Sequence, residues 1–500
     1  MPKFVFLWTD VALWLMALGV LLYAWRVSRS PALRSTWGRV ARDTPAMCSA
    51  VVLAAFAIVG LADSVHYRPL LPPAPGAPAD AAPAYAPSVA SVLDGLLSGT
   101  VLTRPEKTYS EPLAVRQFTK ETMLIDGKPV RDFPLLRGAG AHLADPDRDR
   151  GADLARRLAA GLAGGLAVAA AGAAILYACL RRRAGAPQAR AALLRGESDI
   201  PWRAMAVTFA LLCLAAGALA GLSSGYHALG TDRIGNDVLW QALKSIRTAL
   251  VIGSLTTIAM LPPAIVFGIA AGYFKGKVDD AIQYLYTTIT SIPGVLLVAA
   301  CALMMQVYID NHAGLYDTSA ARADLRLFLL CMILGLTGWS GLCRLLRAET
   351  LKLRELEYVQ AARAFGVSHW RIMTRHLLPN VAHIVLITVV LEFSGLVLYE
   401  AVLSYLGIGV DPSMNSFGSM IDGARLEMSR DPMIWWNLMT AFIFMLALVL
   451  AANLFADAVR DAFDPRTRRY RPARAPGPTG PGRTAALAAD AGAGKRGDAS

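Results

Sequence analysis

Residues 357–380 read Glu-Tyr-Val-Gln-Ala-Ala-Arg-Ala-Phe-Gly-Val-Ser-His-Trp-Arg-Ile-Met-Thr-Arg-His-Leu-Leu-Pro-Asn, a basic, amphipathic segment between two apolar stretches. Gly366 fits the left-handed conformation that commonly ends a helix, so a first short helix is expected to run up to Phe365. Ser368 can cap a second helix, and Pro379 is expected to bound that helix. The sequence therefore predicts two short helices hinged at Gly366, and we call this segment the finger.

The side chains of the finger suggest where it lies and what it contacts. Arg363, Arg371 and Arg375 favour the cytoplasmic side of a membrane. Small and aromatic residues could fill a groove on a partner protein: Val359, Ala362, Phe365, Trp370 and Met373. On charge alone, an ordinary basic loop is the simpler interpretation.

The composition of the whole chain places it in a membrane. Of its 500 residues 55% are hydrophobic and only 17% are charged, whereas about a quarter of the residues of an average soluble protein are charged. We therefore expect an all-α, polytopic membrane helix bundle of about nine spans. The apolar stretches that predict these spans are 8–25, 46–63, 158–180, 204–222, 248–272, 283–309, 327–345, 382–408 and 434–456.

Lys and Arg residues in the connections predict the orientation, because cytoplasmic loops carry an excess of them. Arginines follow the first stretch, and Arg181-Arg182-Arg183 follow the third, so both loops are expected inside. The same parity places Lys275–Lys277, 346–381 and the C-terminal tail inside. The N-terminus and residues 64–157, 223–247, 310–326 and 409–433 are then outside. Topology and anionic lipid explain the net charge of +12 better than nucleic acid does, since the basic residues are scattered.

The chain divides into three regions. Residues 1–181 form an N-terminal membrane region whose extracytoplasmic insertion, 64–157, begins with an extended Pro/Ala-rich linker and continues into a small module at 101–136. Residues 200–464 form the main transmembrane domain. The composition of residues 465–500 predicts a disordered cytoplasmic tail. The six cysteines show no Cys-x-x-Cys spacing and predict neither a disulfide framework nor a metal site.

The finger resembles the cytoplasmic "EAA" loop of ABC-importer permeases, whose pattern is Glu-Ala-Ala, three residues, Gly, nine residues, Ile, one residue, Leu-Pro. Gln360 and His376 replace the Glu and the Ile of that pattern. The matching positions are Ala361, Ala362, Gly366, Leu378 and Pro379. The longer string from Glu357 to Asn380 is similar to the second, C-type permease subunit of the oligopeptide/dipeptide (peptide/nickel) branch.

Further segments carry the same resemblance across residues 200–464. Gly230 to Leu239 resembles the Gly-Thr-Asp-x-x-Gly-Arg-Asp signature of this branch, with Asn236 in place of Arg, and suits a tight turn that caps the next helix. The other similar segments, in order, are 272–274 with 278–280, 292–294, 400–407 and 453–466.

The resemblance implies a function and a set of partners. It implies a permease subunit in the cytoplasmic (inner) membrane of a bacterium, which pairs with a homologous permease, binds two ABC ATPase subunits and receives peptides from an extracytoplasmic solute-binding protein. The residues expected in the ATPase-coupling loop are Glu357, Tyr358, Ala361, Ala362, Arg363, Gly366, Trp370, Leu378 and Pro379. The sequence contains no Gly-x-x-x-x-Gly-Lys-Ser/Thr phosphate loop, so we expect no catalytic residue, cofactor or metal in this chain, and ATP bound by the partner subunits.

Two carboxylates leave a second hypothesis open. Glu392 and Glu400 are eight residues apart on one predicted helix, so both are expected on roughly the same face, where they could line a translocation path. Alternatively, Glu400 is a packing residue that pairs with Arg425, Arg430 or a backbone donor. An ion-coupled secondary transporter or channel would use both carboxylates, but it would leave the finger unexplained. Glycines at 161–165 and 268–272 are interpreted as helix-packing signals.

Overall fold

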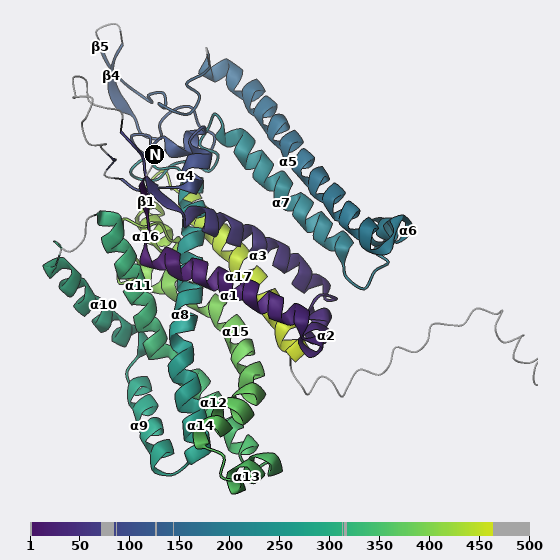
Figure 1. Cartoon of the computed structure of the whole chain (residues 1–500). Helices are drawn as coiled ribbons and strands as arrows, with labels where there is room; N and C mark the ends of the chain where they lie inside the picture. The colour runs from purple at the N-terminus through teal and green to yellow at the C-terminus, as the bar shows by residue number, and fades with distance from the viewer. Residues whose placement is uncertain are drawn as a thin grey trace, which may run out of the picture.

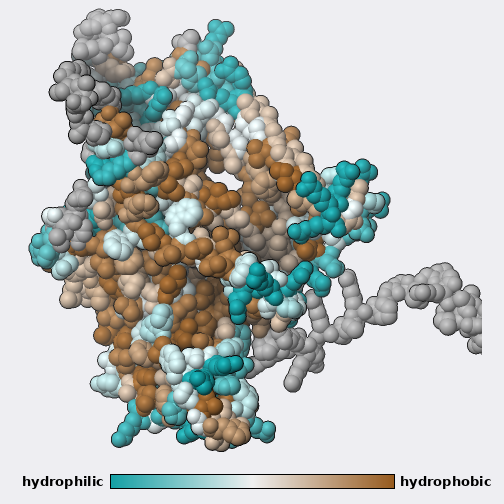
Figure 2. Space-filling view, in the orientation of Figure 1, coloured by the Kyte–Doolittle hydropathy of each residue, from teal (hydrophilic) through white to brown (hydrophobic). Residues whose placement is uncertain are grey.

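The structure is a computed structural model that describes residues 3–71, 85–86, 88–125, 128–143, 145–312, 314 and 318–463. The expected tail, 465–500, and most of the expected linker lie outside the described residues. In the described part, nine helices are long and apolar enough to span a membrane, which confirms the all-α membrane bundle. Figure 2 shows hydrophobic residues over the middle of the face in view, with hydrophilic groups towards its ends.

The N-terminal part contributes four long helices and two small sheets (Figure 1). Its helices are α1 (Trp8–Arg29), α2 (Pro31–Val40), α3 (Thr44–Asp63), α4 (Val92–Leu97), α5 (Pro146–Ala184), α6 (Ala186–Arg190) and α7 (Trp202–Ser223). A 3-10 turn covers Val101–Thr103 and a π-helical turn covers Ala191–Arg195. Strands β1 (Lys3–Val5), β2 (His66–Arg68) and β3 (Ala90–Ser91) form one antiparallel sheet, and β4 (Glu121–Ile125) pairs with β5 (Lys128–Asp132).

The second half of the chain wraps around one long helix, α8 (Val238–Phe274), which packs on α1, α3, α11, α12, α15 and α17. The helices after α8 are α9 (Lys277–Ser291), α10 (Gly294–Asn311), α11 (Ser319–Gly338), α12 (Ser340–Leu353), α13 (Glu357–Ala364), α14 (His369–Ile372), α15 (Leu378–Tyr405), α16 (Phe417–Glu427) and α17 (Trp436–Phe463).

The predicted span at 283–309 is wrong as a continuous helix. The chain breaks after α9 at Ile292 and Pro293, and only α10 is apolar and long enough to cross a membrane. The residue before a proline is pushed out of the helical region, and Ile292 is accordingly extended, with φ −90° and ψ 132°. The predicted span at 327–345 likewise crosses the junction of α11 and α12 at Trp339.

Close backbone contacts join α5 to α7, as the glycine pattern predicts. A Cβ atom added to Gly161 would lie 2.9 Å from the Cα of Gly221, and one added to Gly217 would lie 2.9 Å from the Cα of Gly165. The two helices therefore form a tight pair that depends on small residues, and it stands beside α3 in Figure 1.

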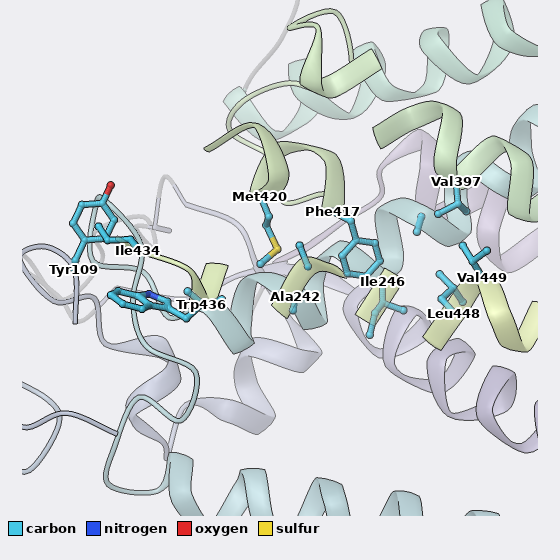
Figure 3. Close-up of a cluster of buried hydrophobic side chains, with 13 residues drawn as sticks. Tyr109, Ala242, Ile246, Val397, Phe417, Met420, Ile434, Trp436, Leu448 and Val449 are labelled. Atoms are coloured by element: carbon cyan, nitrogen blue, oxygen red, sulfur yellow. The ribbon is translucent and has the colours of Figure 1, made fainter. Parts of the chain in front are cut away.

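A buried apolar cluster fixes the end of the bundle opposite the finger. Figure 3 shows its side chains converging from α8, α15, α16 and α17, together with Tyr109 of the insertion. Phe118 of the insertion packs edge-on against Trp436, with ring centroids 5.4 Å apart. The expected small module is thus packed on the membrane domain, sharing its core.

Candidate functional site: the finger, the carboxylates of α15 and the buried ion pairs

The finger contains the predicted hinge. α13 ends at Ala364, Gly366 has φ +72°, and the Gly366 and Val367 N–H groups donate back to the carbonyls of Arg363 and Ala362 at 3.0 and 3.1 Å. No described atom outside the glycine's neighbours lies within 4 Å of where a Gly366 Cβ would stand. The glycine is therefore required by its left-handed backbone and not by crowding.

The other two predicted features of the finger behave differently. Ser368 stands at the N-cap position of α14, but its side chain makes no capping hydrogen bond. Pro379 does not end the helix, because α14 continues through a π-helical turn, Met373–Leu377, into α15. Residues His369–Tyr405 thus form one helix of 37 residues. Proline removes a hydrogen bond and crowds the preceding turn, and the wider π turn just before Pro379 accommodates both effects.

One face of the finger is anchored to the rest of the protein. Val359 and Ile372 are fully buried in a cluster with Tyr273 and Trp339, and Ala362 and Met373 pack against its edge. The expectation that Val359 faces a partner is therefore wrong, whereas Ala362 and Met373 are only partly buried. A one-dimensional pattern identifies apolar residues but cannot tell an internal contact from an external one.

Polar contacts fix the same face. The Tyr273 hydroxyl lies 2.8 Å from Nδ1 of His369, and the Tyr273 carbonyl accepts a 2.6 Å hydrogen bond from Arg354. Arg347 holds both carboxylate oxygens of Asp279, at 2.6 and 2.7 Å, and its hydrogen bonds lower the pKa of that carboxyl. The finger, α8, α9 and α12 are thereby joined at one end of the bundle.

The opposite face of the finger is exposed. Phe365 and Trp370, on either side of Gly366, are 87% and 68% exposed. Glu357, Tyr358, Ala361, Arg363 and Pro379 are also exposed, while Leu378 is half-buried. Two large aromatic rings on a hinge form the kind of surface that enters a groove on another protein.

The structure separates the two carboxylates of α15. Glu400 is 2% exposed and its Oε1 accepts a 2.6 Å hydrogen bond from Ser404 Oγ, whereas Glu392 is exposed. The predicted common face is wrong, because eight residues at about 100° each overshoot two full turns by about 80°. That offset is enough to move one side chain from the core to the surface.

Neither arginine considered as a partner of Glu400 contacts it. Arg425 lies over the ring of Tyr405 at 5.3 Å and Arg430 lies over the ring of Tyr109 at 5.2 Å. Glu400 instead faces the backbone of α16, where a Cβ added to Gly418 would come within 3.0 Å of its Oε1. The Glu400 carboxyl group is therefore surrounded by Ser404 and backbone atoms, and it forms no ion pair with either arginine.

A polar recess of about 540 Å³ opens beside Ser404, between the ends of α10, α11, α15 and α16. Arg326 reaches across it to Asp411 at 3.3 Å and to Gln306 at 3.1 Å. Charged side chains of both signs line the recess: Asp310, Arg322, Arg326, Asp411 and Asp422. Arg322 and Arg326 were not predicted from the sequence, although arginines at the start of an apolar stretch were a usable signal.

The insertion is docked onto the signature segment 230–239. Asp237 caps α8 as predicted, accepting from the N–H groups of Leu239 and Trp240 at 2.8 and 3.1 Å. Its other oxygen lies 2.7 Å from Nδ1 of the buried His227, and Glu106 of the insertion lies 3.5 Å from Nε2. Burial disfavours charge on His227, but the hydrogen bonds and charges of these carboxylates outweigh burial and raise its pKa to about 9.

The N-terminal helix α1 completes a second buried ion cluster. Arg247 of α8 donates to Asp10 of α1 at 2.6 Å and lies 3.4 Å from Asp324 of α11. Thr9 bridges Arg247 and Asp324, and His66 lies 2.7 Å from Asp10. An unpaired buried charge is strongly destabilising, so α1 supplies a counter-ion that the core itself needs. This cluster was not predicted from the sequence, because its members are far apart along the chain.

The helix bundle with its hinged, partly exposed finger is that of a polytopic membrane permease. The chain belongs to the family described as "Binding-protein-dependent transport system inner membrane component", which matches residues 264–469. It is therefore a multi-pass membrane subunit of an ABC importer. The matched segment contains the finger and α15, and it lies entirely after α1, α3 and the insertion.

Curated relatives agree with this assignment. The chain is 30% identical over 244 residues to the oligopeptide transport system permease protein OppC of Haemophilus influenzae, covering 49% of this chain and 72% of that protein. It is 33% identical over 245 residues to OppC of Mycobacterium tuberculosis, covering 49% and 78%. It is 29% identical over 240 residues to the dipeptide transport system permease protein DppC of Lactococcus lactis, covering 48% and 64%. These relatives lend no support to an ion-coupled transporter or channel.

Proposed function

We propose that this chain is one of two permease subunits of an ATP-driven importer that moves oligopeptides or dipeptides into the cell. The peptide cargo is suggested by the relatives, which are oligopeptide and dipeptide transport permeases. In this proposal separate ATPase subunits bind ATP, a homologous permease forms the heterodimer, and a solute-binding protein delivers the cargo. The finger and the C-terminus then lie in the cytoplasm and the N-terminus lies outside.

The observation that carries the proposal is the exposed aromatic pair on the hinge. Phe365 and Trp370 would enter a groove on the ATPase, while the buried face of the finger stays fixed to α8 and α12. ATP binds a closed ATPase pair more tightly than an open one, so any finger position that fits the closed pair is favoured when ATP is present. The ATPase cycle would thereby shift the permease between its inward-open and outward-open states.

The continuity of α14 and α15 provides a route for that shift. The helix His369–Tyr405 has 37 residues and is about 55 Å long, enough to join the finger to the polar recess at the other end of the bundle. A displacement at Trp370 would therefore be carried to Ser404 and Glu400. The charges of both signs in the recess are suited to the amino and carboxyl termini of a peptide, and we propose Glu392 and Glu400 as residues along the path.

The test is reconstitution of the complete importer in lipid vesicles with a Gly366→Val variant. A branched residue is strained at φ +72°, so the finger should lose its shape while the bundle still inserts. We expect ATP hydrolysis to persist and peptide uptake to fall. Gly341→Val is the matched control, because Gly341 also has open space around it but stands in a regular helix.

Two further outcomes separate the hypotheses. Unchanged uptake by the Gly366→Val importer would refute coupling through the finger. Under our proposal, Glu392→Gln should alter ATP-driven uptake only modestly. If instead a pH gradient drives uptake and Glu392→Gln abolishes it, the result would favour an ion-coupled transporter.

A further inference from the structure

A second recess lies in the corner between the last turn of α1 and α2. Its volume is about 530 Å³, and four arginines line it: Arg29, Arg34, Arg39 and Arg42. The remaining lining residues are two serines, a proline and a glycine, so no carboxylate contributes to the wall. A concave surface with four positive charges and no negative one is suited to a phosphate-bearing anion.

The arginines are available to such a ligand. Arg34 and Arg39 make no ion pair or hydrogen bond with the described part of the chain through their guanidinium groups. Arg42 approaches only Asp199, at 3.4 Å, and both side chains of that pair are largely exposed. Arg29 stacks on Trp25 at 4.0 Å, which leaves its N–H groups free around the ring edge.

The position of α2 indicates that the phosphate group would come from a membrane lipid. The opposite face of α2 packs on the last turns of α17, with Val40 buried against Val459 and Ala462. Trp37 donates a hydrogen bond to the Tyr23 hydroxyl at 3.1 Å. Tryptophan and tyrosine gather where a bilayer meets water, so α2 lies across the boundary at the level of the lipid headgroups.

A lipid-facing stripe leads directly into the recess. Leu18, Leu21, Leu22 and Trp25 follow the i, i+3, i+4, i+7 spacing along α1 and are all exposed, and the same helix face ends at Arg29. Acyl chains lying on this stripe would bring their phosphate group to the arginines. A soluble anion would use the arginines but leave the stripe without a role.

We propose that this recess, which we call the basic recess, binds the headgroup of an anionic phospholipid whose acyl chains lie along α1. The bound lipid would fix the added N-terminal helix against α17, next to α15. The proposal does not depend on the transported cargo or on coupling through the finger.

The experiment compares three proteins in nanodiscs of phosphatidylcholine with or without phosphatidylglycerol: the wild type, Arg34→Gln/Arg39→Gln, and the control Arg182→Gln/Arg183→Gln. The control removes the same charge from the end of α5, outside the basic recess. Native mass spectrometry measures the phosphatidylglycerol retained on extraction, and thermal unfolding measures the stabilisation that this lipid gives. We expect affinity for phosphatidylglycerol to fall about 25-fold in the first variant, about fivefold for each arginine, and to stay unchanged in the control.

Added inorganic phosphate distinguishes the two possible sources of the phosphate group. If phosphate stabilises the wild type in phosphatidylcholine as much as phosphatidylglycerol does, the recess is a soluble-anion site and the lipid proposal is wrong. Equal loss of lipid in the control and in the first variant would show only general attraction to a charged bilayer, and this result would also overturn the proposal.

Discussion

The docking of the insertion should depend on the charge of His227. This histidine is fully buried between Asp237 and Glu106, and its pKa is raised from 6.5 to about 9. A raised pKa means that the stabilisation is complete below pH 6.5 and is lost as the pH rises through 9. With one pKa unit worth about 1.4 kcal/mol, docking should weaken by about 2.5 kcal/mol between pH 7 and pH 10.

Glu106 and Tyr109 do not titrate in that interval. Burial alone would raise the pKa of Glu106, but hydrogen bonds from His227 and from the N–H groups of Arg137 and Gly138 lower it, so Glu106 is ionised throughout. Burial and the nearby Glu427 raise the pKa of Tyr109 to about 12. Neither of these two groups contributes to the loss of docking above pH 9.

Hydrogen exchange of the importer in nanodiscs measures this effect. The amide of Glu106, which donates to the Gly235 carbonyl at 2.8 Å, should be protected at pH 7 and far less at pH 10, after correction for intrinsic exchange. A His227→Gln variant should show the weak protection already at pH 7. His142→Gln is the control, since His142 pairs with Asp153 of α5 instead. Full protection in His227→Gln at pH 7, or no change with pH in the wild type, would refute the argument.

Three further predictions concern the bundle. Asp10→Asn should destabilise the protein by about 3–5 kcal/mol in denaturant unfolding, because it leaves Arg247 buried without its closest partner, and adding Arg247→Met should recover most of the loss. Gly217→Ala should separate α5 from α7 and cost about 1–3 kcal/mol, whereas Gly164→Ala, which points to open space, should not; equal costs would contradict the packing argument. Pro379→Ala should let the π turn relax, rotate the finger on α15 and lower the ratio of peptide uptake to ATP hydrolysis; an unchanged ratio would show that the π turn is not needed.

Local features of the fold were predictable from the sequence. Eight of the nine apolar stretches lie in long helices, because length and hydropathy are properties of a single window of sequence, whereas 283–309 is divided between α9 and α10 at Pro293. The left-handed Gly366 and the cap at Asp237 were also predictable, since each depends on the chemistry of one residue and its neighbours. The functional roles of the finger residues stay predictions.

Features that depend on distant contacts were not predictable. Asp10 and Arg247 are separated by 237 positions, and nothing near either residue indicates the other. The sequence does not show that Pro293 and Pro379 have different effects. In the structure the helix α9 ends before Pro293, whereas a π turn before Pro379 lets the helix continue. Whether a helix breaks or widens at a proline depends on how firmly its two sides are packed, and α15 is held on both sides by α12 and α17.

The positions at which α8 and α15 are held by contacts, and at which α8 can bend, suggest how the finger could move the bundle. The first end of α8 is held by Asp237 and Arg247, and its last turn contacts the finger through Tyr273. Between these ends, Pro262 and Pro263 interrupt the hydrogen bonds of the helix. We therefore expect α8 to bend at these prolines while α15, which is continuous, transmits the displacement. Spin labels at the two ends of α15 should keep their separation through the ATP cycle, whereas labels at the two ends of α8 should change theirs. A changing distance along α15 would locate the flexible point in its π turn and refute this mechanism.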